Sequence, residues 1–323
     1  METISGMSNW RLTLRREEGG VVLLRAETCD ARAVLPDRLF GLPVTALDNH
    51  ALAPEGREIE GERLTITCGV PGQREWDNRR MEELTLPASL ERVGNYAFLN
   101  CSALKTLRLH DGVTHWGSGA LMNCRLLDTF FLTRTEPEQG PSLAYLAGEL
   151  YRELDVTVTE TDGSVFRLLF PEFVELYEEN ISAHHFDYFI SGAGYPYHHC
   201  FRQKRLSLKE YDTLWRDFLG MEHDEAAAIR LAWFRLRWPV ELGETAAAGY
   251  RAFLQSHAGE ALSLLLEEEE AISLLVAETQ PDRESLAAAC ALARERGKTA
   301  ALAVLLEERN RRFPAGWEKS FAL

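Results

Sequence analysis

LTLPASLERVGNYAFLNCSALKT (residues 84–106) is followed directly by LRLHDGVTHWGSGALMNCRLLDT (residues 107–129), and the two stretches are copies of one 23-residue unit. The paired leucines at the start, the central glycine (Gly94 and Gly117) and the Asn-Cys pair near the end recur at the same places. A further strand begins at Phe130. A fixed period of this length predicts a stacked solenoid rather than a globule with one centre.

Each copy has a simple physical interpretation. In a strand of the form Leu-x-Leu the two leucines point inward and the residue between them points outward. The glycine after Val93 or Trp116 permits a sharp turn, and the alanine and large apolar residue that follow fill the interior. A single unit cannot bury this apolar surface alone, so a neighbouring unit has to cover it.

The residues before the clear copies continue the same architecture in a weaker form. Alternating apolar residues over 10–26, with a Gly-Gly turn, predict a β-hairpin that caps the stack. Residues 34–52 match a degenerate copy, and Leu64 to Ile66 are expected to form another strand of the stack. The polar segment TEPEQGP at 135–141 is the expected boundary. We therefore expect a leucine-rich-repeat domain with an N-terminal β-hairpin cap at residues 1–140.

The remaining residues, 141–323, predict a mainly α-helical domain. Two apolar strands over 154–169 flank the turn Thr-Asp-Gly-Ser and predict one β-hairpin. Helical hairpins are expected over 207–312, where Ser207 opens a capping box and Asp282 caps a later helix. The fold class is therefore α+β, a short solenoid followed by helices.

Composition and charge narrow the functional classes. The chain has 323 residues and a net charge of −15, which argues against nucleic acid or an anionic membrane as partner because phosphate would be repelled. The six cysteines contain no C-x-x-C pair. The first residues show no secretory signal and no apolar run reaches the length of a membrane span. A cytoplasmic location is the expectation.

The repeats resemble the BspA-type bacterial leucine-rich repeat family. The resemblance is carried by Asn95-Tyr96-Ala97-Phe98-Leu99-Asn100-Cys101, followed by Leu104, Leu107 and Leu109. It implies a solenoid that serves as a binding protein, since family members are often adhesins or secreted binding proteins. The segment 257–312 is weakly similar to ankyrin-type helical hairpins, although an antiparallel helical bundle would show the same periodicity.

The outward positions of the repeat strands form a candidate binding face. They are expected to run from Arg63 to Thr133 and are mixed polar, with one aromatic residue near the end. A solvated sheet and an interaction face both fit this composition, and solenoid sheets commonly bind partners. The residues that we expect to contact a protein partner are Thr85, Arg108, His110, Thr129 and Phe131.

A second candidate site is rich in histidine. The segment HHFDYFISGAGYPYHHCF at 184–201 could ligate a metal ion. Adjacent histidines point to different faces in regular structure, however, and the H-x-x-x-H spacing is absent. An aromatic loop and a partner-binding patch are the other interpretations. The metal candidates are His184, His185, His198, His199 and Cys200.

The favoured function from sequence is non-enzymatic protein–protein interaction, with no catalytic residue, metal or cofactor expected. It rests on the repeats and on the absence of a complete catalytic motif. Two alternatives stay open. One is a metal-dependent hydrolase at the histidine segment, and the other is a scaffold in which the helical domain is the binding element.

Overall fold

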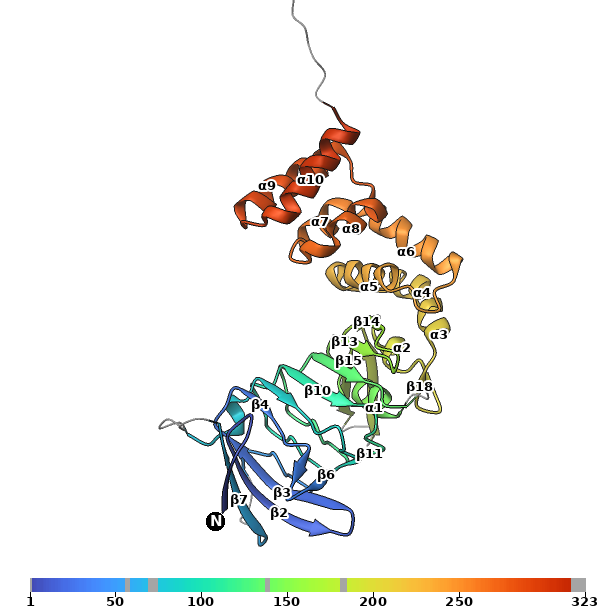
Figure 1. Ribbon diagram of the computed structural model, residues 1–323. Coiled ribbons are helices and arrows are strands. Elements are labelled where there is room, and N and C mark those ends of the chain that lie inside the picture. Colours follow the sequence, from blue (N-terminus) through green and yellow to red (C-terminus); the bar gives the residue numbers. More distant parts are fainter. Residues whose placement is uncertain (1, 56–58, 69–74, 137–139, 181–184, 315–323) are drawn as a thin grey trace, which may run out of the picture. The chain divides into compact units, whose positions relative to one another are not determined.

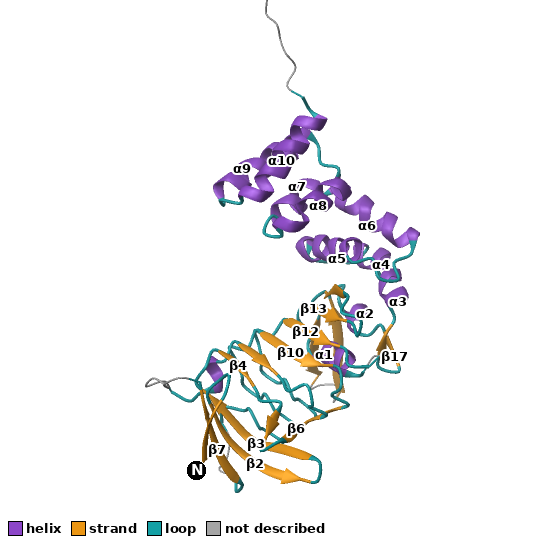
Figure 2. Cartoon of the chain, viewed as in Figure 1, coloured by secondary structure: helices purple, strands orange, loops and turns teal. Residues whose placement is uncertain are grey.

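The computed structural model describes residues 2–55, 59–68, 75–136, 140–180 and 185–314 (Figure 1). Two compact units are present, an N-terminal unit (Met1–Leu214) and a C-terminal unit (Trp215–Leu323). Among the described residues, no helix has the length and apolar character needed to cross a membrane. Figure 2 shows that strands and connecting loops dominate the first unit and helices the second.

The solenoid of the N-terminal unit is built around a six-stranded sheet. Its inward residues Leu84, Leu107, Phe130 and Val156 stand in register and are fully buried. The strands are parallel except for the last pair, which is the hairpin predicted from sequence. In spatial order the strands are β4 (Arg32–Val34), β8 (Glu83–Thr85), β10 (Thr106–His110), β12 (Thr129–Thr133), β13 (Leu154–Thr159) and β14 (Val165–Phe170).

An eight-stranded sheet forms the other wall of the solenoid. The predicted N-terminal hairpin is present as β2 and β3, and β3 pairs in parallel with β6 of the first repeat. In spatial order the strands are β1 (Glu2–Ser5), β7 (Glu62–Thr67), β2 (Trp10–Glu17), β3 (Gly20–Thr28), β6 (Leu42–Leu47), β9 (Arg92–Val93) and β11 (His115–Trp116), with β5 (Arg38–Leu39) paired to β6.

One strand lies in a different sheet from the one expected. The segment Leu64 to Ile66 belongs to β7, which pairs with β2 and β1 in the eight-stranded sheet. Arg63 and Thr65 are therefore not part of the outward column, and Thr65 is buried. The local pattern resembles a repeat strand, but pairing with the N-terminal hairpin decides its place.

Backbone spacing between successive turns explains the recurring glycines. A Cβ on Gly94 would lie 2.5 Å from the backbone nitrogen of Asn49, and one on Gly117 would lie 2.3 Å from that of Asn95. Side chains link the same turns, since the Asn49 Oδ1 accepts from the Asn95 N–H at 2.7 Å. Only glycine at these positions allows the turns to stack so closely.

The two repeat cysteines are buried free thiols, as their equivalent positions predict. The Cys101 thiol donates to the Leu52 carbonyl at 3.4 Å, and the Cys124 thiol donates to the Phe98 carbonyl at 3.2 Å. Burial raises the pKa of Cys124 to about 12, so the thiol stays protonated and acts as a small apolar side chain.

The six-stranded sheet continues past the expected boundary at 140/141. Strand β13 pairs in parallel with β12, so residues up to Phe170 extend the solenoid wall. Between these strands α1 (Ser142–Glu149) takes the place of a strand on the other wall. The two units divide at Leu214/Trp215, because hydrogen bonding between strands joins the residues after 141 to the solenoid.

The N-terminal unit ends with short elements, of which the sequence predicted only the helix that Ser207 opens. Two further hairpins follow the predicted one, so the prediction of a single hairpin is incomplete. The elements are β15 (Val174–Asn180), β16 (His185–Ser191), α2 (Tyr195–His198), β17 (Phe201–Arg202), β18 (Arg205–Leu206) and α3 (Leu208–Thr213). The predicted cap is present, since the Ser207 hydroxyl accepts from the Glu210 N–H at 3.2 Å.

The C-terminal unit consists of stacked helices. Helix α5 packs on α6 and α9 on α10, while α7 contacts α9 and α8 contacts α10. Asp282 caps α9 as predicted, accepting from the Ser285 N–H at 2.7 Å. The helices are α4 (Trp215–Leu219), α5 (Glu225–Arg237), α6 (Glu244–Ser256), α7 (Ala258–Leu264), α8 (Ile272–Thr279), α9 (Arg283–Glu295) and α10 (Thr299–Arg312).

Candidate functional site

The outward face of the six-stranded sheet brings the five predicted contact residues together. Arg108 stands opposite Thr85 on one side and Phe131 on the other, so these three form a continuous row across β8, β10 and β12. Thr129 and His110 lie two residues from this row on the same face, because side chains along a strand alternate. We call these five residues the Arg108 surface.

Arg108 is the central cation of this surface. Its guanidinium carbon lies 3.8 Å from the centre of the Phe131 ring. Arg108 is exposed, and Phe131 is half-buried beneath it. Among the described residues, no carboxylate lies within ion-pair distance of Arg108. The ring therefore holds the guanidinium in place while its hydrogen-bond donors stay available.

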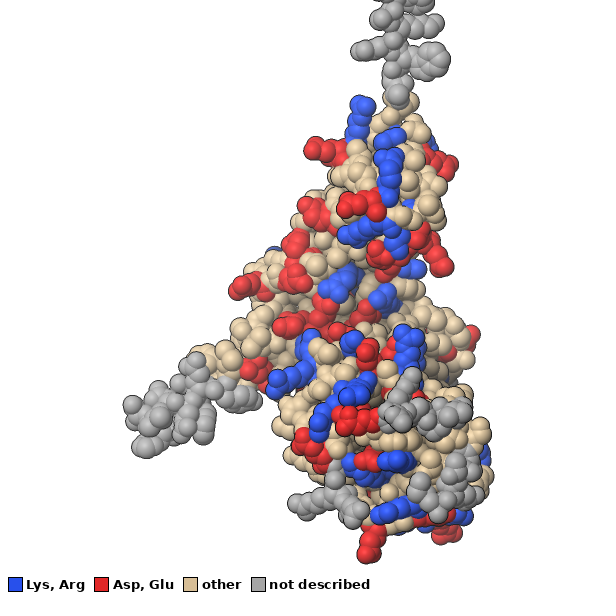
Figure 3. All heavy atoms as spheres, turned by 90° about the vertical axis from the view of Figure 1, so that its left-hand side faces the viewer, with Lys and Arg blue, Asp and Glu red and all other residues tan. Residues whose placement is uncertain are grey.

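Other charges on the same sheet are paired. At one edge, Arg32 lies 3.1 Å from Glu83. Toward the opposite edge, Arg167 forms an ion pair with Asp155. Basic and acidic side chains are also interspersed on the face shown in Figure 3. Arg108 differs from these arginines because its neighbour is an aromatic ring rather than a carboxylate.

Polar groups beside Arg108 complete the surface. The Thr129 hydroxyl donates to the Asp128 carboxylate at 2.8 Å. The Nδ1 of His110 is buried and has no hydrogen-bond partner within the described part of the chain. Thr157 follows Phe131 in the same row. The surface thus offers the Arg108 cation, the Phe131 ring, the His110 imidazole and several hydroxyl groups.

The predicted metal candidates do not form a ligand set in the described residues. No group of three or more His, Cys, Asp or Glu side chains could hold a metal ion there. His184 lies outside the described residues, and the side chain of His185 is not described. His199 stacks on Tyr195 with ring centres 4.0 Å apart. The Cys200 thiol donates to the Tyr197 carbonyl at 3.0 Å, and burial raises its pKa to about 12.

His198 has a structural environment. Its Nδ1 lies 2.8 Å from the carbonyl oxygen of Ala147, and its Nε2 lies 2.9 Å from that of Pro171. Burial lowers the pKa of His198, and the two carbonyl oxygens oppose this shift. Both ring nitrogens face main-chain carbonyl oxygens, one in α1 and one in the segment after β14, so neither is directed at a ligand. In the neutral ring only one of them donates.

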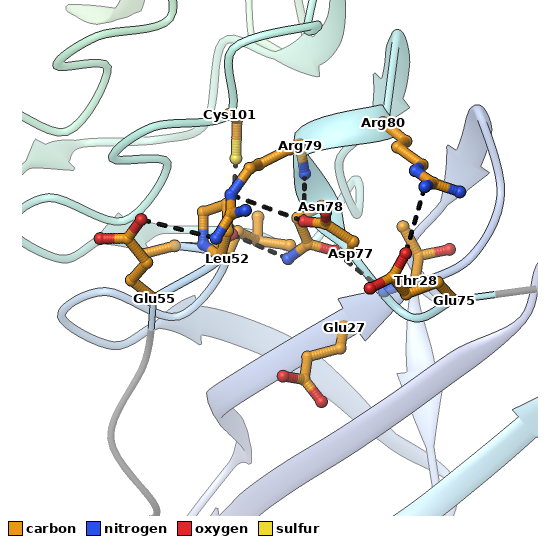
Figure 4. Close-up of polar contacts among 12 residues, drawn as sticks. Glu27, Thr28, Leu52, Glu55, Glu75, Asp77, Asn78, Arg79, Arg80 and Cys101 are labelled. Carbon is orange, nitrogen blue, oxygen red and sulfur yellow. Dashed lines mark hydrogen bonds and ion pairs between the residues drawn. The ribbon is translucent and has the colours of Figure 1, made fainter.

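Asn78 is a buried polar residue whose importance the sequence did not reveal (Figure 4). It opens the short 3-10 helix Asn78–Arg80, which Asp77 caps. Its Oδ1 accepts from the Thr28 N–H at 2.9 Å, and its Nδ2 donates to the carbonyls of Ala26 and Leu52 at 2.8 Å each. The amide is thus fully used in joining β3 to the first repeat turn.

A match to a protein-family model agrees with this architecture. A family model described as a BspA type leucine-rich repeat region (6 copies) matches residues 72–143. No curated protein matches the chain.

Two solved structures are similar at low identity. The first is the T. pallidum leucine-rich repeat protein, with 18% identity and a TM-score of 0.29 over 38% of this chain and 50% of that chain. The second is a leucine-rich cell surface protein from Faecalibacterium prausnitzii A2-165, with 14% identity and a TM-score of 0.28 over 49% of this chain and 42% of that one. The matches thus span half or less of each of those chains. Residues 72–143 match the BspA-type leucine-rich repeat family, as the motif Asn95 to Cys101 predicted.

Proposed function

We propose that this protein is a non-enzymatic interaction protein that binds another protein through the Arg108 surface. The observation that supports this most is the Arg108 guanidinium, stacked 3.8 Å above the Phe131 ring without a carboxylate partner among the described residues. The leucine-rich repeat region adds support, since solenoid sheets commonly serve as binding faces.

The chemistry of the surface favours a carboxylate on the partner. A guanidinium is planar and can donate two parallel hydrogen bonds to one carboxylate. Threonine hydroxyls beside it can donate to or accept from a neighbouring backbone. The half-buried Phe131 ring offers apolar contact next to the charge. A partner segment that carries Asp or Glu beside an apolar side chain fits these groups.

Affinity purification of the full-length protein from its native cells, followed by mass spectrometry, tests the proposal. We expect the double variant Arg108→Glu, Phe131→Ala to lose the specific partners of the wild type. Arg63→Glu is the matched control, because Arg63 is exposed on β7 in the other sheet. Retention of all specific partners by the double variant would rule out the Arg108 surface as the binding site.

The helical unit is a second candidate for the binding element. Its helices stack hairpin on hairpin, with α7 against α9 and α8 against α10, as in an extended repeat array. Leu264 and Leu274 are exposed apolar side chains on this stack, at 39% and 40%. If Leu274→Lys removes the partners that Arg108→Glu retains, the solenoid serves as a scaffold and the helices bind.

A further inference from the structure

A groove of about 310 Å³ lies at the end of the solenoid, on a different part of the N-terminal unit from the Arg108 surface. It is bordered by the end of β11, by α1 and by the turn between β17 and β18, which come together in Figure 1. The residues lining it are Thr114, His115, Trp116, Pro141, Ala144, Tyr145 and Lys204. We call it the Trp116 groove.

Two aromatic rings in fixed positions line the groove. Trp116 and Tyr145 stack with ring centres 4.8 Å apart and planes inclined by 14°. The Trp116 Nε1–H donates to the Ser142 hydroxyl at 3.3 Å. The Tyr145 hydroxyl donates to the Gly117 carbonyl at 2.8 Å and accepts from the Ala120 N–H at 3.2 Å. Since their polar atoms are already used, the rings present hydrocarbon surface to a ligand.

The polar groups that remain for a ligand are cationic or neutral. Lys204 and His115 are exposed, and neither forms an ion pair with the other described residues. Among the described residues that line the groove, none is acidic. His115 also lines an adjoining hollow of about 190 Å³, in which Arg15 and Arg92 both pair with Glu17. Lys204 is therefore the cation that remains for a ligand in the groove.

We propose that the Trp116 groove binds a small carboxylate attached to a ring. The ring would pack on Trp116 and Tyr145, and the carboxylate would pair with the Lys204 ammonium. Both aromatic acids and uronic acids have this chemistry, because a sugar ring also presents a C–H face that packs on indole. The groove volume of about 310 Å³ is at the small end of the range of ligand pockets.

Isothermal titration calorimetry on the full-length protein tests this proposal with four probes. Indole-3-acetate and D-glucuronate carry the carboxylate, and indole-3-acetamide and D-glucose are their neutral counterparts. The variants are Lys204→Met and Trp116→Leu, with Lys209→Met, exposed on α3, as the matched control. We expect the Lys204 variant to weaken binding about fivefold, as for loss of a charge-assisted contact, and the Lys209 variant to leave it unchanged.

Each outcome decides the proposal. Binding of indole-3-acetate alone identifies aromatic acids as the ligand class, and binding of D-glucuronate alone identifies uronic acids. In both cases the neutral counterpart has to bind more weakly. Absence of binding by both acids, equal binding of acid and neutral counterpart, or binding insensitive to Lys204→Met would overturn the proposal. Lys204→Met changes an exposed side chain and leaves the aromatic rings intact.

Discussion

The two sheets of the solenoid differ on their outer sides. The six-stranded sheet exposes polar side chains there, such as Arg108 and the half-buried Thr85. The eight-stranded sheet instead has a small buried apolar cluster of Val22, Leu24 and Ala46, against which Ile59 packs. Both sheets bury their inner faces, but the covered cluster leaves less of the second sheet open. The contrast supports the proposal that a protein partner binds the six-stranded sheet.

The sequences of the strands already contain this difference. Strand β10 reads TLRLH and alternates between buried and outward residues. Strand β3 reads GVVLLRAET, and its first five residues are all buried. Alternation is typical of a strand with one solvated face, whereas a continuous apolar run is typical of a strand covered on both faces.

The largest effect on the free energy of unfolding is expected when an inward residue is replaced by alanine, compared with the same change at its outward neighbour. Phe130 is fully buried and Phe131 is half-buried on the opposite face. We expect Phe130→Ala to lower the free energy of unfolding by about 4 kcal/mol, through lost burial and a cavity. Phe131→Ala should cost about 1 kcal/mol, mainly the contact with Arg108. Urea denaturation measures both, and similar losses for the two variants would contradict the assignment of faces.

A smaller loss is expected where the turns stack most closely. A Cβ at position 117 would lie 2.3 Å from the backbone nitrogen of Asn95, so Gly117→Ala should cost about 3 kcal/mol through a forced shift between repeats. Gly148→Ala is the control, because no described heavy atom outside the adjacent residues and backbone of α1 lies within 4 Å of its Cβ position. That variant should be neutral or slightly stabilising. Thermal unfolding of both variants checks the prediction. A Gly117→Ala variant with the stability of the wild type would refute it.

The covered side of the eight-stranded sheet provides the third test. Leu24 is 4% exposed within the small cluster. We expect Leu24→Ala to cost about 2 kcal/mol, at the low end for such a change because a small cluster can partly collapse. Thr85→Ala on the open sheet should change the free energy of unfolding by less than about 0.5 kcal/mol. If the Thr85 variant is the more destabilised one, the difference between the two outer faces does not hold.

The smallest expected effect on folding stability comes from Asp111, the residue that follows β10. Asp111 is buried, accepts from the Gly140 N–H at 2.6 Å, and burial raises its pKa. An acid whose pKa is raised by folding binds its proton more tightly in the folded state, so folding stability rises as the pH falls through that pKa. Relative to Asp111→Asn, the wild type should therefore gain stability between about pH 7 and pH 4. Denaturation curves across this range test the sign, and a relative loss would contradict it.

Much of the solenoid could be predicted because its amino-acid sequence repeats with a fixed period. Thr85, Arg108 and Phe131 are separated by one repeat each, so the period alone places them in one row. The two clear repeats followed from the same period, and the N-terminal hairpin followed from its own apolar alternation and Gly-Gly turn. Strand β7 did not, because Leu64-Thr65-Ile66 has the local pattern of a repeat strand and only pairing with β2 places it.

The remaining features depend on contacts that cannot be predicted from the local sequence pattern. The Trp116 groove joins residues from three distant segments, represented by His115, Tyr145 and Lys204. The β15–β16 hairpin was not predicted, because the alternation of Tyr188 and Ile190 lies in a segment whose composition also fits an aromatic loop. The buried amide of Asn78 lies in a segment whose polar sequence predicts only a loop.

The hydroxyl of Tyr145 has a consequence for how the solenoid could change in length. It bonds to the backbone N–H of Ala120 and to the carbonyl of Gly117, so α1 lies directly against the last turn. At the opposite end, β3 lies against β6. New turns therefore cannot be appended at the Tyr145 end without replacing α1, whereas a duplicate of residues 84–106 could be inserted between existing copies. Gain or loss of internal copies would lengthen the Arg108 surface one row at a time and leave both ends unchanged.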